Sequence, residues 1–323
     1  MTIQITKNDT KNSLSSKELD SFKKEFNKKH CILLPKFIHS DLLKSIQDEI
    51  KLCKFSKRIH KGIGEELYLK NNKLIGLLFF MLNQKKLFHI IKKITGCNKI
   101  ESFLGRVYKF VPRLGHFDTW HNDLKDNRLL ALSINLSTDI YSGGVFQIRN
   151  RYSKKVIHEI KNTGFGDAIL FRLRKDLEHK VTNVRSKVSK IAYAGWFRVK
   201  PRTNNFTKKQ LLKHGSKIKK NYYLPLNNKK SKVTLTDHLK INQAVISRKD
   251  GNQVLIFKTD SGSFCLFNPI GSRLWELLNE TSDLQETFHT MKDEYHVSPD
   301  ILKKDILNQV QEFKNIGLVS SIN

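Results

Sequence analysis

Six short apolar or alternating runs between residues 102 and 199 constrain the fold more than any other feature of the sequence. They are separated by Gly, Asn and Asp residues, and they occupy residues 102–111, 128–137, 143–150, 155–161, 166–173 and 190–199. Runs of this length and spacing are typical of strands in a barrel or a two-sheet jelly roll. The preceding hundred residues are mainly helical in pattern, so we expect helices packed on the outside of one sheet.

The helical patterns lie in three segments. Residues 15–29 predict a surface helix, residues 39–53 predict an amphipathic helix, and residues 71–96 predict two buried helices. Residues 31–38 form a short strand-like run. The second segment places four apolar side chains on one face: Leu42, Leu43, Ile46 and Ile50. The predicted fold class is therefore α+β, a double-stranded β-helix (jelly roll) with flanking N-terminal helices.

The cysteine content and the N-terminus exclude two classes of protein. The chain of 323 residues has four cysteines, which are far apart and form no C-x-x-C motif. Neither a disulfide framework nor a zinc–thiolate site is therefore expected. The N-terminal segment is polar and lacks a signal-peptide core, and no run approaches the roughly 20 apolar residues of a membrane span. We expect a cytoplasmic protein with no membrane partner.

Charge is distributed unevenly along the chain. The net charge is +29, but residues 233–323 contain nine basic and twelve acidic residues, a net charge of −3 that leaves +32 on the rest. Residues 201–232 contain no acidic residue and two prolines, which is typical of an exposed linker. The predicted organisation is a polar segment and helix at 1–29, a larger domain at 30–200, a basic linker at 201–232 and a small domain at 233–323.

Two histidine–aspartate pairs stand just before the second predicted strand. In an extended segment, residues i and i+2 point to the same side, so His121 and Asp123 can direct a nitrogen and an oxygen at one point. A third ligand from a distant strand, for which His179 is the candidate, would give two histidines and one carboxylate. That set is the facial triad of non-haem Fe(II) oxygenases, which leaves coordination positions open. His116 and Asp118 form a competing pair with the same spacing.

A longer series of motifs surrounds this pattern. In chain order it consists of Tyr108, His121 and Asp123, Arg128, Gly143 and Gly144, Gly166 and Asp167, His179 with Val181 and Val184, Lys190 and Trp196. With this order and spacing, residues 30–200 resemble the prolyl-hydroxylase-like branch of the Fe(II)/2-oxoglutarate-dependent dioxygenases. The resemblance implies Fe(II), 2-oxoglutarate and O2 as cofactors, with iron held by the two histidines and the aspartate of the triad.

The same resemblance gives roles to other residues. Lys190 would bind the distal carboxylate of 2-oxoglutarate through a charge-assisted hydrogen bond. The segment before this lysine is slightly longer than is usual in the family and lacks its glycine, so Lys187 remains an alternative. Tyr108 is either a second donor to the co-substrate or a core residue, and Trp196 is expected in the core. The carboxylate of Asp123 favours hydroxylation, because halogenating relatives lack it.

Residues 233–323 predict three short strands followed by three helices. The strands lie within residues 243–268, and the helices lie within 269–280, 282–297 and 298–319. This order predicts a winged-helix-like domain. Winged helices often bind DNA, but affinity for nucleic acid depends on neutralising phosphates, and this domain is slightly acidic. Nucleic acid is therefore not the expected partner.

Three segments of this domain carry a second resemblance: "LFN" at Leu266–Asn268, "SRLWELLNE" with Trp275, and "DILNQVQEFKNIGLV" near the end. Through them it is similar to the PqqD-type domains that recognise leader peptides in pathways to ribosomal peptide natural products. In that family the leader adds as a strand to the small sheet and packs against the last helix. The resemblance places six residues in the groove, of which the helical ones are also typical of a core: Phe264, Leu266, Phe267, Ile306, Val310 and Phe313.

Together these patterns predict a leader-guided Fe(II)/2-oxoglutarate-dependent hydroxylase that acts on a residue of a ribosomally synthesised precursor peptide. Tethering through the leader raises the local concentration of the peptide at the catalytic site. The basic catalytic half favours an acidic peptide, with Asp or Glu near the target. Two alternatives remain, an oxygenase that acts on nucleic acid or another protein and a peptide carrier without catalysis.

Overall fold

The computed structural model describes residues 2–7, 9–70, 73–125, 127–161, 164–199 and 233–322. These residues form two compact units, one on each side of residues 200–232. The predicted linker at 201–232 lies outside the described residues. The N-terminal unit carries the predicted metal ligands, and the C-terminal unit carries the predicted peptide groove.

The N-terminal unit contains the helices α1 (Ser16–Lys29), α2 (Ser40–Lys51), α3 (Lys73–Leu82) and α4 (Lys85–Thr95). A capping box starts α1, since the Ser15 hydroxyl accepts from the Glu18 N–H and the Glu18 carboxylate accepts from the Ser15 N–H. The predicted apolar face of α2 is buried. No described helix alone is long and apolar enough to cross a membrane, although the bent pair α3 and α4 passes that test together.

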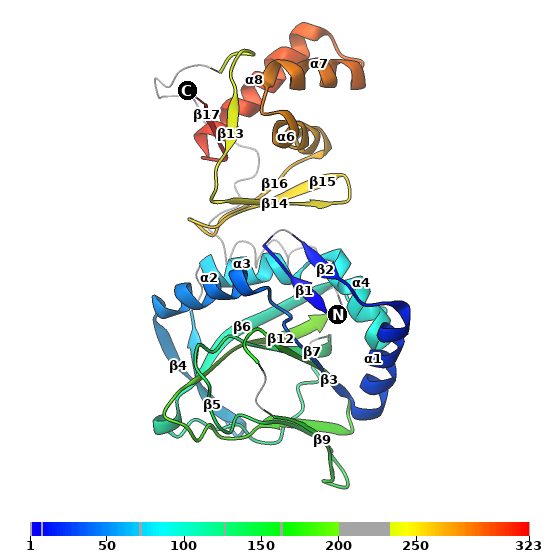
Figure 1. The fold of residues 1–323 in the computed structure, drawn as a ribbon, viewed down its shortest axis with the longest axis vertical. Helices are drawn as coiled ribbons and strands as arrows, with labels where there is room; N and C mark the ends of the chain where they lie inside the picture. The colour runs from blue at the N-terminus through cyan, green and yellow to red at the C-terminus, as the bar shows by residue number, and fades with distance from the viewer. Residues whose placement is uncertain are drawn as a thin grey trace. The chain divides into compact units, whose positions relative to one another are not determined.

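Two antiparallel sheets make up most of the rest of this unit, which confirms the predicted jelly roll (Figure 1). The large sheet has the order β3 (Cys31–Leu34), β10 (Ala168–Arg172), β7 (Arg128–Asn135), β12 (Lys190–Arg198), β6 (Ser102–Phe110), β5 (Gly64–Leu69) and β4 (Phe55–His60). The small sheet has the order β11 (Leu177–Val181), β8 (Phe146–Asn150) and β9 (Val156–Ile160). Phe146 of the small sheet packs on Phe171 of the large sheet, with ring centroids 4.7 Å apart, so the two sheets enclose a common core.

Several short elements were not predicted from the sequence. β4 and β5 form a hairpin that extends the large sheet, β1 (Ile3–Ile5) pairs with β2 (Thr10–Asn12), and a 3₁₀ turn occupies Pro112–Leu114. The hairpin lacks the usual apolar alternation, because charged side chains stand on both of its faces. One of them, Glu66, is buried against Arg106 of β6 at 2.9 Å.

The register of β12 separates an inner face from an outer face. Side chains two apart share a face, so Lys190, Ala192, Ala194 and Trp196 point to one side, and Phe197 points to the other. Helices α2, α3 and α4 lie against the outer face (Figure 1), where Phe197 is fully buried and Phe88 of α4 packs on it at 6.0 Å. The helices therefore do not cover the inner face of the large sheet, and the predicted metal site lies on that side.

The C-terminal unit has the predicted three strands and three helices. Its elements are β13 (Leu239–Ile241), β14 (Val245–Asp250), β15 (Gln253–Lys258), β16 (Phe264–Leu266), α6 (Pro269–Thr281), α7 (Leu284–Glu294), α8 (Pro299–Asn315) and β17 (Val319–Ser321). β14, β15 and β16 form an antiparallel sheet, and β13 pairs separately with β17. Trp275 of α6 and Phe313 of α8 meet in the core with ring centroids 5.7 Å apart. This arrangement fits the winged-helix-like prediction.

The substitution Phe197→Ala should lower the free energy of unfolding of the N-terminal unit by about 3–5 kcal/mol, because it leaves a cavity between the sheet and α4. Urea unfolding followed by circular dichroism measures this. Ile140→Ala is the control, since Ile140 is 79% exposed, and it should change the same free energy by no more than about 0.5 kcal/mol. Equal effects of the two substitutions would contradict the packing described.

Candidate metal centre

The segment before β7 lies beside β11 and brings distant residues together. The N–H of His121 donates to the carbonyl of His179 at 3.1 Å, and the N–H of His179 donates to the carbonyl of His121 at 3.0 Å. Three residues earlier, the Asp118 carboxylate accepts from the Val181 N–H at 2.8 Å. These bonds extend the small sheet by one short stretch. They fix two histidines, 58 positions apart in the sequence, as direct neighbours.

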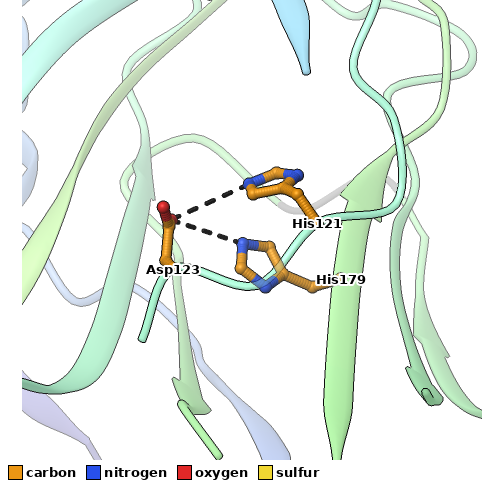
Figure 2. A group of neighbouring side chains, drawn as sticks. All are labelled: His121, Asp123 and His179. Carbon is orange, nitrogen blue, oxygen red and sulfur yellow. Dashed lines mark ion pairs between the residues drawn. The ribbon is translucent and has the colours of Figure 1, made fainter. Parts of the chain in front are cut away.

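The three predicted ligands converge on one point (Figure 2). The Asp123 Oδ2 atom lies 3.8 Å from Nε2 of His121 and 3.6 Å from Nε2 of His179. One ligand atom from each residue lies within 4.8 Å of the others. In the part of the chain that the structure describes, no other group of three such side chains converges this closely. Two nitrogens and one oxygen can therefore bind a single metal ion from one side.

His121 is oriented by groups behind it. Its Nδ1 lies 2.7 Å from the Thr119 carbonyl oxygen and 3.3 Å from the Asp118 carboxylate. Both contacts require the proton on Nδ1, which leaves Nε2 to face the metal. Burial disfavours the charged ring, but the carboxylates of Asp123 and Asp118 outweigh it and raise the pKa of His121 to about 9. Burial also raises the pKa of Asp118 to about 6.

His179 lies in a more apolar setting. Its ring packs on Phe171, with centroids 4.6 Å apart, and it stacks near Phe146 at 6.2 Å. Burial, with the nearby His121 charge, lowers the pKa of His179, so its ring is neutral near pH 7. A neutral imidazole is the form that binds a metal.

Asp123 is held by two donors. Arg128 donates to Oδ1 at 3.0 Å and the Trp196 indole N–H donates to Oδ2 at 3.0 Å. The Arg128 guanidinium also stacks on the Trp196 ring, 3.6 Å from its centroid. Burial favours the protonated acid, yet the two imidazoles hold the pKa of Asp123 well below its usual range. The carboxylate is therefore charged and fixed in orientation.

Trp196 was expected in the core, and the structure instead gives it a role beside the site. It lies on the inner face of β12 and is only partly buried. Strand alternation places it on the face shared with Lys190, which is a signal that the sequence contained. The same alternation also describes a core residue, so it did not distinguish the two roles.

The competing pair does not form the centre. The Nδ1 of His116 accepts from the Val111 N–H at 3.0 Å, and its ring lies 6.4 Å from that of Phe110. His116 is therefore committed to the backbone of its own turn. Asp118 supports His121 from behind and is not part of the converging group.

The two candidate lysines have opposite environments. Lys190 is buried and donates to the Gly144 carbonyl at 2.9 Å, whereas Lys187 is exposed. Burial lowers the pKa of Lys190 to about 8. Among the described residues no carboxylate forms an ion pair with Lys190. A buried ammonium group without an anionic partner is costly, so the inner face is suited to bind an anion there.

Glycines make room for this lysine. Gly144 has φ of +62°, and a Cβ there would lie 3.1 Å from the Lys190 side chain and 2.9 Å from the Tyr141 ring. Gly143 has φ of +75°, and a Cβ there would clash with the Asn183 carbonyl oxygen. Both positions therefore require glycine, because φ is positive there and because neighbouring atoms leave no room for a Cβ.

Tyr108 lies on the same inner face as Lys190. It is directly opposite Ala192 in the pairing of β6 with β12, two strand positions from the lysine. Its side chain is 6% exposed, burial raises the pKa of its hydroxyl, and that hydroxyl bonds with Ser133. The hydroxyl is therefore protonated at neutral pH and faces the interior of the jelly roll.

In the C-terminal unit, the predicted groove residues separate into two sets. Leu266 at the end of β16 is 56% exposed, whereas Phe264 and Phe267 are 5% and 9% exposed. The three helical residues have exposures of 2% or less and belong to the core of the domain: Ile306, Val310 and Phe313. They lie inside the domain instead of on its surface, because their i, i+4 and i+7 spacing faces the sheet. Their contact with a peptide stays a prediction.

Comparison with known proteins assigns both units to classes. Residues 106–198 match the 2OG-Fe(II) oxygenase superfamily, and residues 253–319 match the family of coenzyme PQQ synthesis protein D (PqqD). The chain therefore combines a 2OG-Fe(II) oxygenase domain with a PqqD domain. The superfamily match implies Fe(II), 2-oxoglutarate and O2 as cofactors. No curated protein matches the chain.

Solved structures similar to the chain include relatives of both domains. A prolyl-4-hydroxylase from Pseudomonas putida is 15% identical, with a TM-score of 0.45, over 57% of this chain and 100% of that one. A prolyl hydroxylase from Trichoplax adhaerens, in complex with a hypoxia inducible factor peptide fragment, is 14% identical, with a TM-score of 0.43, over 58% and 94%. TbiB1 in complex with the TbiA(beta) leader peptide is 25% identical, with a TM-score of 0.25, over 26% and 98%.

The substitution Trp196→Phe should weaken metal binding about 10–100-fold, because it removes the indole N–H that orients Asp123 and keeps an aromatic ring for Arg128. Anaerobic titration with Fe(II) measures the affinity. Trp120→Phe is the matched control, since the Trp120 ring lies 4.1 Å from the Arg149 guanidinium and 4.7 Å from the Lys180 ammonium group, and it should leave the affinity unchanged. If Trp120→Phe weakened Fe(II) binding and Trp196→Phe did not, the orienting role of Trp196 would be refuted.

Metal affinity should rise with pH up to about 9, by roughly tenfold per pH unit, because Fe(II) must displace a proton from His121. The substitution Asp118→Asn removes a carboxylate that raises the pKa of His121, so it should move this rise to lower pH. Titrations at several pH values measure both curves. An affinity that is independent of pH between 6 and 9 would show that His121 is not a ligand.

Proposed function

We propose that this protein is an Fe(II)/2-oxoglutarate-dependent hydroxylase that modifies a residue of a ribosomally synthesised precursor peptide, recruited through its leader by the PqqD domain. The observation that carries the proposal is the convergence of His121, Asp123 and His179 in a chain that also matches PqqD. An oxygenase site and a domain of a peptide-recognition class are present on one polypeptide. The peptide is therefore the partner that best accounts for both.

The residues present fit the cofactors. His121, Asp123 and His179 would hold Fe(II), since they offer two imidazole nitrogens and one carboxylate oxygen and leave one side of the ion free. Lys190, buried without a carboxylate partner, would bind the distal carboxylate of 2-oxoglutarate, and Tyr108 would donate a hydrogen bond to it. With these groups bound, one atom of O2 would enter the new carboxylate of succinate as 2-oxoglutarate loses CO2, and the other would enter a C–H bond of the substrate.

Residues of the chain prepare this chemistry. Arg128 and Trp196 hold the Asp123 carboxylate in its orientation. Phe171 and Phe146 shield the ring of His179 from water. Ala192 and Ala194 separate Lys190 from Trp196 on the inner face of β12, where they pack with Tyr108 and Tyr141.

The edge of β16 is the proposed docking site for the leader. Within the described residues, β16 pairs only with β15, so its other edge presents unpaired backbone groups to an added strand. Leu266 is exposed beside this edge, and Cys265 packs against the core cluster that includes Phe313 of α8. A leader strand would therefore contact both the sheet and α8.

Incubation of the full chain with Fe(II), 2-oxoglutarate and a candidate precursor should yield a peptide heavier by one oxygen atom together with one equivalent of succinate. Mass spectrometry and a succinate assay measure the two products. His179→Ala should abolish both, whereas Lys187→Ala should retain them because Lys187 is exposed. Full activity of His179→Ala would refute the proposed site.

Removal of residues 201–323 should weaken turnover of the full precursor and spare turnover of a leaderless peptide at high concentration, because only the tethered substrate gains effective concentration. The ratio of kcat/KM for the two substrates, measured before and after truncation, gives the test. Equal losses for both substrates would count against leader recruitment.

A further inference from the structure

A group of charged side chains lies on the inner face of β4, β5 and β6, beside the metal centre. The Arg106 Nε donates to the Glu66 carboxylate at 2.9 Å, and His60 Nε2 lies 3.5 Å from the same oxygen. Arg58 stands directly opposite Glu66 in the β4–β5 pairing, with its guanidinium 5.7 Å from the Tyr68 ring. The group therefore contains two guanidinium ions and one carboxylate.

The register connects this group to the metal ligands. Arg106 is opposite Ala194 in the pairing of β6 with β12, so it lies on the face that also carries Trp196. Its guanidinium is 5.5 Å from the Trp196 ring, and the indole N–H of Trp196 reaches Asp123 at 3.0 Å. A substrate side chain in contact with Arg106 would thus lie next to the iron ligands.

Positive charge is in excess in this group. Glu66 is buried, with its side chain 8% exposed, and it pairs with Arg106. The terminal nitrogens of Arg106 have no hydrogen-bond partner in the described parts of the chain, and Arg58 forms no ion pair there. Arg58 is exposed to solvent, and partial desolvation with the nearby Arg106 charge lowers its pKa. Two cations held close together beside a single carboxylate are stabilised when a second anion binds.

We propose that Arg106 and Arg58 bind the side-chain carboxylate of an Asp or Glu residue in the substrate, and thereby select an acidic residue at or beside the modified position. The inference rests on the proposed function for the identity of the reaction, but it concerns binding. The planar guanidinium of Arg106, with its terminal nitrogens available, matches the two oxygens of a carboxylate.

The inner face of the large sheet carries two sets of cations, Lys190 and the pair Arg106 and Arg58. Two separate anion sites would account for both sets. Lys190 is opposite Phe110 and Arg106 is opposite Ala194, four strand positions apart, which is about 13 Å along the sheet. Lys190 would bind the co-substrate at one end of the site. Arg106 and Arg58 would bind the substrate carboxylate on β6 and β4, the strands on either side of β5, where both side chains lie beside Glu66.

The test uses the full chain with Fe(II) and 2-oxoglutarate under anaerobic conditions, so that binding is measured without turnover. The probes are acetylated and amidated pentapeptides of sequence Gly-Ala-Xaa-Ala-Gly, in which Xaa is Asp, Glu or Asn, and isothermal titration calorimetry gives each Kd. The unmodified chain should bind the better of the two acidic peptides about tenfold more tightly than the Asn peptide. Arg106→Gln and Arg58→Gln should each reduce this preference to about twofold or less.

Two further variants make the result specific. Lys109→Gln removes a positive charge from the same strand on its other face, where Lys109 lies over the Phe55 ring, and it should keep the full preference. Arg106→Lys keeps the charge without the planar fork and should keep part of it. Arg58→Gln remains informative if Arg106→Gln destabilises the chain by leaving Glu66 unpaired, because Arg58 makes no ion pair of its own.

The proposal is overturned if the unmodified chain binds acidic and Asn peptides equally, or if the Arg variants keep the preference. It is also overturned if Arg106→Gln weakens 2-oxoglutarate binding and leaves the peptide preference intact, since the cations would then serve the co-substrate. Failure of the proposed function has a different signature. In that case no peptide yields succinate or gains oxygen in air, while the binding preference is still measurable.

Discussion

The backbone pairing of His121 with His179 is the interaction on which the site depends. Two hydrogen bonds of 3.1 and 3.0 Å join a loop before β7 to the middle of β11. The bond from Val181 to Asp118 holds the same loop at a second point. Because the loop is extended, Asp123 follows on the same side as His121, and the triad is complete once the pairing forms.

Support for the triad comes from the large sheet, so the site belongs to both sheets. Arg128 opens β7 and Trp196 lies on β12, and both bond to Asp123. The inner face of β12 then continues through two alanines to Lys190. One strand therefore carries the group that orients a metal ligand and the cation proposed for the co-substrate, and the hydrogen-bonded ladder fixes their separation.

The sequence predicted the ligands better than their surroundings. The i, i+2 spacing of His121 and Asp123 is shared by His116 and Asp118, so the ordered series of motifs was needed to favour the first pair and to select His179 as its partner. Trp196 was not predicted as an orienting residue, because the alternation of β12 describes a core side chain equally well. The hairpin of β4 and β5 was missed since its inner face carries Arg58 and Glu66, which gives no apolar alternation.

The C-terminal unit shows a similar limit. The three strands of its sheet and its three helices were predicted in order, because turns, caps and prolines mark their ends, whereas the short pair of β13 and β17 was not predicted. The spacing of Ile306, Val310 and Phe313 identifies the buried face of a helix, and it does not distinguish a groove from a core. The structure places all three in the core.

The most direct test of the account is an anomalous difference map, measured at the iron absorption edge from crystals of the full chain grown anaerobically with Fe(II). The account predicts one peak per chain, within bonding distance of Nε2 of His121, Nε2 of His179 and a carboxylate oxygen of Asp123. A peak at another group of side chains, or a peak that remains in place after Asp123→Ala and His179→Ala are combined, would contradict it.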